Sequence, residues 1–193
     1  MEGGGTRNKY NPEIHHRHSI RLKDYDYRQA GGCFVTVCTQ NRECLFGDVV
    51  DGEMRLNEAG RMTIKTWIGL TDRFPFIELD EFVVMPNHMH GIILIVGVRL
   101  GGPNKGAASS APTLGDVMRT FKSIAAININ RLLERTGRPL WQRNYYEHII
   151  RNEEDLNRIR EYITNNPTRW AEDEDNPENI KQHANFFNIC KFF

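Results

Sequence analysis

Two histidines separated by one residue are the side chains of this sequence with the clearest capacity for chemistry. His88 and His90 are followed by an aliphatic run from Ile92 to Val96. Branched aliphatic residues without a break favour a buried β-strand, and residues i and i+2 of a strand point to the same face. The two imidazoles therefore project together and could form half of a metal site. The alternative is a pair of polar residues at a strand start, hydrogen-bonded to their neighbours.

A tyrosine and an asparagine near the end of the chain could complete such a site. Tyr162 lies on a helix predicted from 152 to about 165, and Asn166 follows it by four residues at the helix end, so the two share one helical face. A tyrosine hydroxyl can act as a covalent nucleophile, and an asparagine amide oxygen can be a third ligand beside His88 and His90. A metal held there would polarise a phosphoryl oxygen. The alternatives are a tyrosine that only packs and an asparagine that only ends a helix.

Two other classes of His-x-His protein do not fit the chain. A nucleotide-hydrolysing histidine triad needs a third alternating histidine, and position 92 is isoleucine. A metal hydrolase built on a large β/α barrel needs about 250 residues, whereas this chain has 193.

Apolar periodicity and turn signals predict the elements that position these side chains. Asp51-Gly52 predicts the turn of a hairpin over 49–56, and Asn57 and Thr113 are predicted helix caps. Besides the His88 strand, which is expected to pair antiparallel with the strand before it, strands are predicted at 33–39, 77–85 and 145–150. Helices are predicted at 58–72, 114–136 and 152–165.

Composition limits the class of protein and of partner. Lys+Arg and Asp+Glu are 25 each, so the formal net charge is zero and a polyanion must be met by a local patch. The four cysteines show no CxxC spacing and are expected to be reduced thiols. No apolar run approaches the ~20 residues of a membrane span, and no secretory signal is visible. A cytoplasmic protein without membrane contact is expected.

Local composition divides the chain into parts. Residues 1–20 are expected to be a flexible basic arm, and residues 171–193 a solvated acidic tail that avoids DNA. The folded domain is expected over 21–170. Within it, the stretch 97–112 is rich in glycine, serine, alanine and proline, which predicts a flexible loop.

One stretch of the chain is locally basic. From Asp116 to Arg143 six basic residues stand against two acidic ones. This is the best local candidate for a phosphate-contacting surface, and the alternative is an ordinary charged helix face.

The histidine motif and several other stretches resemble one family. Pro86-Asn87-His88-Met89-His90-Gly91 resembles the histidine motif of single-tyrosine HUH transposases. The resemblance covers roughly residues 20–170 and leaves the 97–112 loop and both tails unmatched. Further stretches look like the REP-associated tyrosine transposase branch, namely 25–27, 34–42, 45–47, 141–151 and 161–167.

The resemblance implies a fold and a site. The fold is α+β, with a central antiparallel β-sheet flanked by helices, of the ferredoxin-like or RRM-like HUH endonuclease type. The histidines lie on a central strand and the tyrosine on a late helix. Tyr162 matches the family's nucleophile, and Asn166 matches a third ligand that is Gln in other HUH transposases. The implied cofactor is Mg²⁺ or Mn²⁺, although two imidazoles alone favour softer metals.

The implied function is metal-dependent nicking and strand transfer of single-stranded DNA at hairpin-flanked sites, through a 5′-phosphotyrosine. The partner is single-stranded DNA with a hairpin, and the protein acts as a monomer or homodimer. His148 is a candidate for proton transfer or for a structural hydrogen bond. Residues expected to contact DNA are Arg119, Lys122, Arg143, Tyr146 and Arg151.

Two alternatives to this function remain. One is a hairpin-binding protein with a vestigial site. The other is a rolling-circle or relaxase-type nickase.

Overall fold

The computed structural model describes residues 31–96 and 113–179. The predicted basic arm, the predicted 97–112 loop and the tail beyond residue 179 lie outside the described residues.

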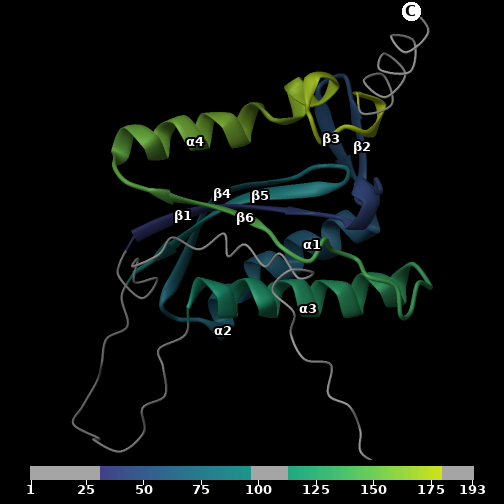
Figure 1. Ribbon diagram of the computed structural model, residues 1–193, viewed down its shortest axis with the longest axis horizontal. Helices are drawn as coiled ribbons and strands as arrows, with labels where there is room; N and C mark the ends of the chain where they lie inside the picture. The colour runs from purple at the N-terminus through teal and green to yellow at the C-terminus, as the bar shows by residue number, and fades with distance from the viewer. Residues whose placement is uncertain (1–30, 97–112, 180–193) are drawn as a thin grey trace, which may run out of the picture.

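A four-stranded antiparallel sheet forms the centre of the fold (Figure 1). Its order is β4-β5-β1-β6, so β1 and β5 are the central strands. The strands are β1 Gly31–Cys38, β4 Ile77–Val84, β5 His88–Ile95 and β6 Tyr146–Ile150. The predicted α+β fold with a central antiparallel sheet is confirmed, and both histidines lie on a central strand.

Helices cover both faces of the sheet (Figure 1). One face carries α1 Glu58–Ile68, α2 Leu70–Arg73 and α3 Leu114–Leu132. The other carries α4 Glu153–Asn165, followed by the 3₁₀ helix η2 Pro167–Glu172. A hairpin of β2 Gly47–Val50 and β3 Glu53–Leu56 follows the short 3₁₀ turn η1 Gln40–Arg42.

The alternation of β5 divides its side chains between two cores. Met89 and Ile93 belong to the large core under α1 and α3, which contains Trp67. Ile92 belongs to a smaller core under α4. Because strand residues alternate between faces, His88 and His90 lie on the α4 face with Ile92.

Local signals account for most element boundaries. Asp51 and Gly52 have φ of 55° and 77°, which confirms the predicted hairpin turn. Asn57 caps α1 by accepting a hydrogen bond of 3.0 Å from the Gly60 amide. The predicted helix 58–72 is interrupted at Gly69, and the predicted helix 114–136 ends earlier, at Leu132.

None of the helices within the described residues is long and apolar enough to cross a membrane.

Gly91 allows an indole ring to approach the strand that carries the histidines. A Cβ at position 91 would lie 2.6 Å from Trp67 Cζ2 and 3.3 Å from the Phe82 Cβ. Trp67 is fully buried in the large core, so its ring has no room to withdraw.

We expect Gly91→Ala to destabilise the fold by roughly 1–3 kcal/mol, the usual cost of overpacking a core. Chemical denaturation of the purified protein would measure it. Trp67→Phe shortens the opposing ring. The double variant should therefore lose less stability than the sum of the losses of the two single variants. Full additivity would show that the indole does not press on position 91.

Candidate active site

Each histidine ring is held at Nδ1, which leaves Nε2 available. His88 is 0% and His90 4% exposed, and their ring centroids lie 4.6 Å apart. His88 Nδ1 lies 2.9 Å from Asn87 Oδ1, and His90 Nδ1 lies 2.8 Å from Thr36 Oγ1. Holding one ring nitrogen of a histidine by an oxygen is the usual way in which a metal-binding imidazole is oriented.

The tautomer of His88 follows from the bonds of its neighbour. The Asn87 amide nitrogen donates to the carbonyls of Arg42 (3.1 Å) and Asp175 (2.7 Å), so its Oδ1 faces the ring as an acceptor. His88 Nδ1 must therefore carry the hydrogen, and Nε2 carries the lone pair. This Nε2 is buried without a hydrogen-bond partner.

Burial keeps both imidazoles neutral. It lowers the pKa of His88 and lowers that of His90 well below its ordinary value. A neutral imidazole is the form that binds metals, so the pair is poised as ligands at neutral pH.

Asn166 brings a third donor atom to the pair. It follows the last turn of α4 and is 2% exposed, and its Oδ1 has no hydrogen-bond partner. Its amide is near enough to both neighbours to raise the pKa of His88 and lower that of Tyr162. A buried acceptor without a partner costs about 1–3 kcal/mol, so two such atoms, His88 Nε2 and Asn166 Oδ1, fit a cradle for a cation.

Tyr162 stands directly beside this cradle. Its hydroxyl lies 3.3 Å from His90 Nε2, and the two ring centroids are 5.1 Å apart. The residue is 42% exposed, so a substrate could reach it. Burial, followed by the charge of Asp173, raises the pKa of Tyr162, and the phenol is therefore protonated at neutral pH.

Apolar contacts place α4 over the histidines. Ile159 and Ile163 are buried against Phe34 and Ile92, and burying each isoleucine contributes roughly 1.5–3 kcal/mol. Arg160 also forms a two-pronged ion pair with Asp80 on β4, at 2.8 and 2.6 Å. The exposed guanidinium is screened by solvent, so this pair sets the position of the helix more than its stability.

The sequence left two roles open for His148, proton transfer and a structural hydrogen bond, and the structure shows a hydrogen bond. Its Nε2 forms a 2.9 Å bond with Asp155 at the start of α4. This bond, with a second one from Arg158, lowers the pKa of Asp155 to about 2.

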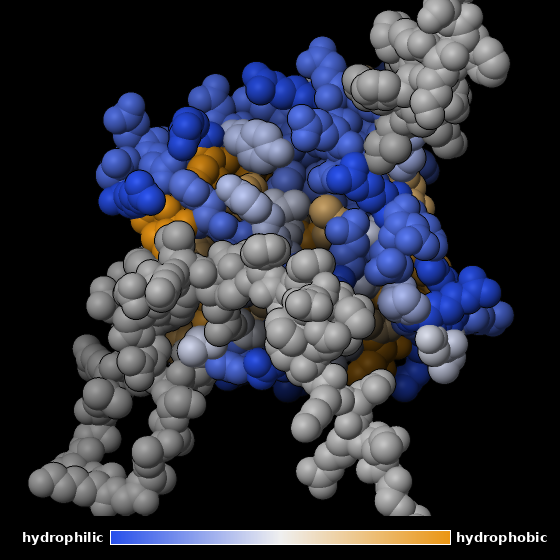
Figure 2. Space-filling view, in the orientation of Figure 1, coloured by the Kyte–Doolittle hydropathy of each residue, from blue (hydrophilic) through white to orange (hydrophobic). Residues whose placement is uncertain are grey.

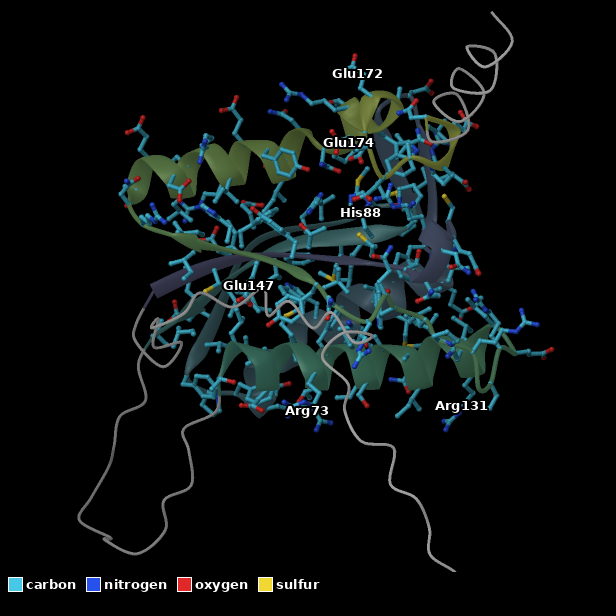
Figure 3. The ribbon with its side chains drawn as sticks, viewed as in Figure 1. Arg73, His88, Arg131, Glu147, Glu172 and Glu174 are labelled. Carbon is cyan, nitrogen blue, oxygen red and sulfur yellow. The ribbon has the colours of Figure 1, made fainter. Side chains whose placement is uncertain are left out.

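Composition predicted that the acidic segment after α4 is solvated. Within the described residues, part of this segment is instead held against the fold. Asp175 forms a 2.9 Å ion pair with Arg42, and Asn176 is buried. Residues 172–175 line a hollow of about 290 Å³ together with Tyr162 and Asn166. Figure 3 shows Glu172 and Glu174 on the α4 side of the sheet, the side toward which the His88 ring faces. Arg42 and Asn87, which are distant in the chain, hold the segment at Asp175, while Glu172, Glu174 and Glu178 are exposed.

A second hollow opens on the other side of the Tyr162 ring. This cleft of about 520 Å³ is lined by His90, Phe34 and Tyr146 and by the polar side chains Gln142 and Asn144. Tyr146 is exposed and meets Phe34 edge to face at 6.3 Å. Figure 2 shows apolar side chains below α4 on a surface that is otherwise largely hydrophilic. An aromatic cleft of this size suits a nucleobase.

The predicted DNA-contacting residues are distributed unevenly around this site. Tyr146 lines the cleft. Arg143 is exposed beside the wall of the cleft, and Arg151 is exposed just before α4. Arg119 lies on α3, across the sheet from α4. Arg131, also on α3, is drawn on that far side in Figure 3.

Lys122 makes structural hydrogen bonds, and its assignment as a phosphate contact stays a prediction. Its Nζ donates to the carbonyls of Gln142 (2.6 Å), Arg143 (3.0 Å) and Asn144 (3.3 Å). These bonds use all three of its hydrogens. Lys122 therefore fixes the segment that forms one wall of the cleft.

The sequence reasoning also missed three residues that surround the site. Thr36 and Asn87 orient the rings, and Asp173 lies nearby as the largest charged influence on Tyr162. Asn87 could have been found from its place inside the histidine motif. Thr36 and Asp173 come from distant parts of the chain and carry no such signal.

Within the described residues, no three histidine, cysteine, aspartate or glutamate side chains gather closely enough to hold a metal ion. The candidate centre has two imidazoles and an amide, which is a different donor set.

Comparison with known proteins gives relatives by sequence and by structure. No protein-family model matches the chain. An uncharacterized protein of Haemophilus influenzae is 43% identical over 178 residues, which cover 86% of this chain and 96% of that protein.

Two solved structures are similar in fold. A REP-associated tyrosine transposase bound to a REP hairpin is 22% identical, with a TM-score of 0.53 over 77% of this chain and 73% of that chain. A Deinococcus radiodurans R1 protein, provisionally described as a transposase, is 16% identical, with a TM-score of 0.44 over 75% of this chain and 95% of that chain. The first likeness confirms, at the level of the fold, the resemblance that the motifs indicate.

We expect Lys122→Met to lower the free energy of unfolding by about 1–2 kcal/mol, because it removes the donor shared by three carbonyls. Arg119→Met, on the same helix, removes an equal charge whose partner is the exposed neighbour Asp116, and should have an effect within about 0.5 kcal/mol. Thermal or urea unfolding of both variants would measure this. Equal stabilities of the two variants would show that the three bonds of Lys122 do not stabilise the fold.

Proposed function

We propose a function for this protein, which belongs to one family with the uncharacterized Haemophilus influenzae protein: it is a metal-dependent enzyme that nicks and rejoins single-stranded DNA at hairpin-flanked sites. The observation that carries the proposal is the convergence of His88, His90, Asn166 and Tyr162 on one face of the sheet. The fold shared with a transposase bound to a REP hairpin supports it.

His88 Nε2, His90 Nε2 and Asn166 Oδ1 would hold Mg²⁺ or Mn²⁺. When bound, such a cation polarises a phosphoryl oxygen and stabilises the charge that develops on it. The chain supplies the neutral form of both imidazoles through burial. Asn87 and Thr36 hold the two rings at Nδ1, so that each ring presents its Nε2 as the candidate donor atom.

Tyr162 is the nucleophile in this proposal. Its oxygen forms a bond to the scissile phosphorus, and the bond from phosphorus to the 3′ oxygen breaks. The phenol loses its proton and the leaving oxygen gains one, which produces a 5′-phosphotyrosine and a free 3′-OH. Since the ester bond is kept, a second 3′-OH can reverse the step and join another strand.

The cleft beside Tyr162 gives a reason for single strands. The aromatic residues that line it include Phe34, Tyr145, Tyr146 and Tyr162, and Gln142 and Asn144 add polar groups. An unpaired base can enter such a cleft and stack on a ring, whereas a paired base is held in its duplex. We place the nucleotide next to the scissile phosphate there.

We expect Tyr162→Phe to abolish covalent attachment to DNA, because the variant keeps the ring but lacks the attacking oxygen. Its stability should change by less than about 1 kcal/mol, the worth of one hydrogen bond. The measurement is a denaturation-resistant adduct on a labelled single-stranded hairpin oligonucleotide, with mass spectrometry of the digest. The matched control, Tyr146→Phe, should still form the adduct at Tyr162. An adduct in Tyr162→Phe, or one mapped to another tyrosine, overturns the assignment.

A second expectation concerns the cation. Nicking should require Mg²⁺ or Mn²⁺, and replacing both His88 and His90 with Ala should abolish nicking while hairpin binding, measured by gel shift, stays largely intact. Thermal unfolding of the double variant would establish that it is folded. Full nicking by the wild-type protein in excess chelator contradicts the proposed centre.

The vestigial hairpin-binding alternative predicts hairpin binding without an adduct in the wild-type protein. The same oligonucleotide experiment therefore separates it from the enzyme.

A further inference from the structure

A half-buried carboxylate without a cationic partner lies beside the candidate cation centre. Asp173 lines the 290 Å³ hollow that also contains Tyr162 and Asn166. Its neighbour Asp175 is neutralised by Arg42. For Asp173, no ion pair with any described residue is found, although Arg169 also lines the hollow. Its carboxylate therefore has a negative charge that no direct ion pair neutralises.

This charge conflicts with the proposed reaction unless a cation is present. Asp173 and Tyr162 line the same hollow, where the carboxylate disfavours a second negative charge on the attacking oxygen. It would also repel the phosphodiester that must approach Tyr162. A divalent cation between these groups removes both repulsions.

The proposed direct ligands of the cation centre lack a negative charge, which Asp173 could supply. His88, His90 and Asn166 are all neutral ligands, whereas Mg²⁺ is usually bound through one or two carboxylates and keeps several of its waters. The buried, unpartnered Oδ1 of Asn166 lines the same hollow as Asp173. One cation would therefore satisfy the orphaned amide oxygen and the unpaired carboxylate together.

The carboxylate is also held in a fixed place relative to the histidines. The Asp175 amide donates to Asp173 Oδ1 at 2.6 Å, which orients the side chain. The Asn87 side chain bonds both His88 Nδ1 and the Asp175 carbonyl. Arg42 binds the Glu174 carbonyl at 2.8 Å as well as the Asp175 side chain. The acidic segment and the His88 ring are thus tied to one another through Asn87.

We propose that Asp173 is part of the cation site, binding the hydrated cation through its coordinated water while His88, His90 and Asn166 supply the direct donor atoms. Contact through water agrees with the finding that, among the described residues, no acidic side chain joins the two histidines closely enough to form a three-residue metal group. The inference rests on the proposed function and gives the site the negative charge that its direct ligands lack.

The test is a titration of the full-length protein with Mn²⁺ in the absence of DNA. Electron paramagnetic resonance measures the concentration of the free ion at each step. Asp173→Asn keeps the oxygen that accepts from the Asp175 amide and removes only the charge. We expect it to weaken Mn²⁺ binding about 10-fold, the lower end of the effect of outer ligands. Glu178→Gln, an equal charge change in the same segment outside the hollow, should leave the affinity within about 2-fold of wild type.

A second measurement distinguishes this role from shielding of the site against DNA. Asp173→Asn should lose nicking at limiting Mn²⁺ and recover it at high Mn²⁺. An acidic segment that only repels DNA predicts unchanged Mn²⁺ affinity and faster nicking in the variant, and that result overturns the inference. If His88→Ala binds Mn²⁺ as well as wild type does, the cation centre itself is wrong, which is a different failure from an inert Asp173.

Discussion

The strict alternation of β5 between two packed faces is the constraint on which the site depends. Met89 and Ile93 are locked into the large core by α1 and α3, so His88 and His90 must face α4. A slip of one residue would bury both imidazoles among apolar side chains and turn Met89 toward the site. Because β5 is flanked by β1 and β4, each neighbour fixes its register. The geometry of the histidines is thus secured by contacts on the opposite face of the sheet.

Helix α4 depends on the same face of the sheet for its place. Ile159 and Ile163 bury themselves against the strand that carries the histidines and against Phe34 on β1. This contact sets the last turn of the helix, with Tyr162 and Asn166, above the histidine pair. The apolar contact supplies most of the free energy that holds α4 against the sheet. The Arg160–Asp80 ion pair determines the position of the helix along β4. The Tyr162 hydroxyl is therefore presented by rigid elements, as its proposed role of nucleophile requires.

The charges of the molecule are arranged differently from what their positions along the sequence indicate. The basic stretch around α3 is partly used inside the fold, since Lys122 holds three carbonyls and Arg135 pairs with Glu43. The acidic segment, by contrast, comes to the side of the histidines. Lone pairs and carboxylates therefore converge where a cation would satisfy them, and aromatic rings line the adjoining cleft. In the proposed function, the cation and the stacking rings take the place of a broad basic surface.

The sequence alone predicted most of the elements and the residues to which the proposed function assigns the chemistry. Alternation placed His88 and His90 on one face, helical spacing placed Tyr162 one turn before Asn166, and Asp51-Gly52 predicted its turn. These are local properties, because strand and helix periodicity need no knowledge of distant contacts. Only the tertiary structure decided that α4 packs beside β5, that Thr36 holds His90, that Lys122 bonds three carbonyls and that Asp173 lines the hollow beside Tyr162. Each of these depends on partners far away along the chain, such as Arg42 for Asp175 and Gln142 for Lys122, and a charge pattern does not specify which distant group will neutralise it.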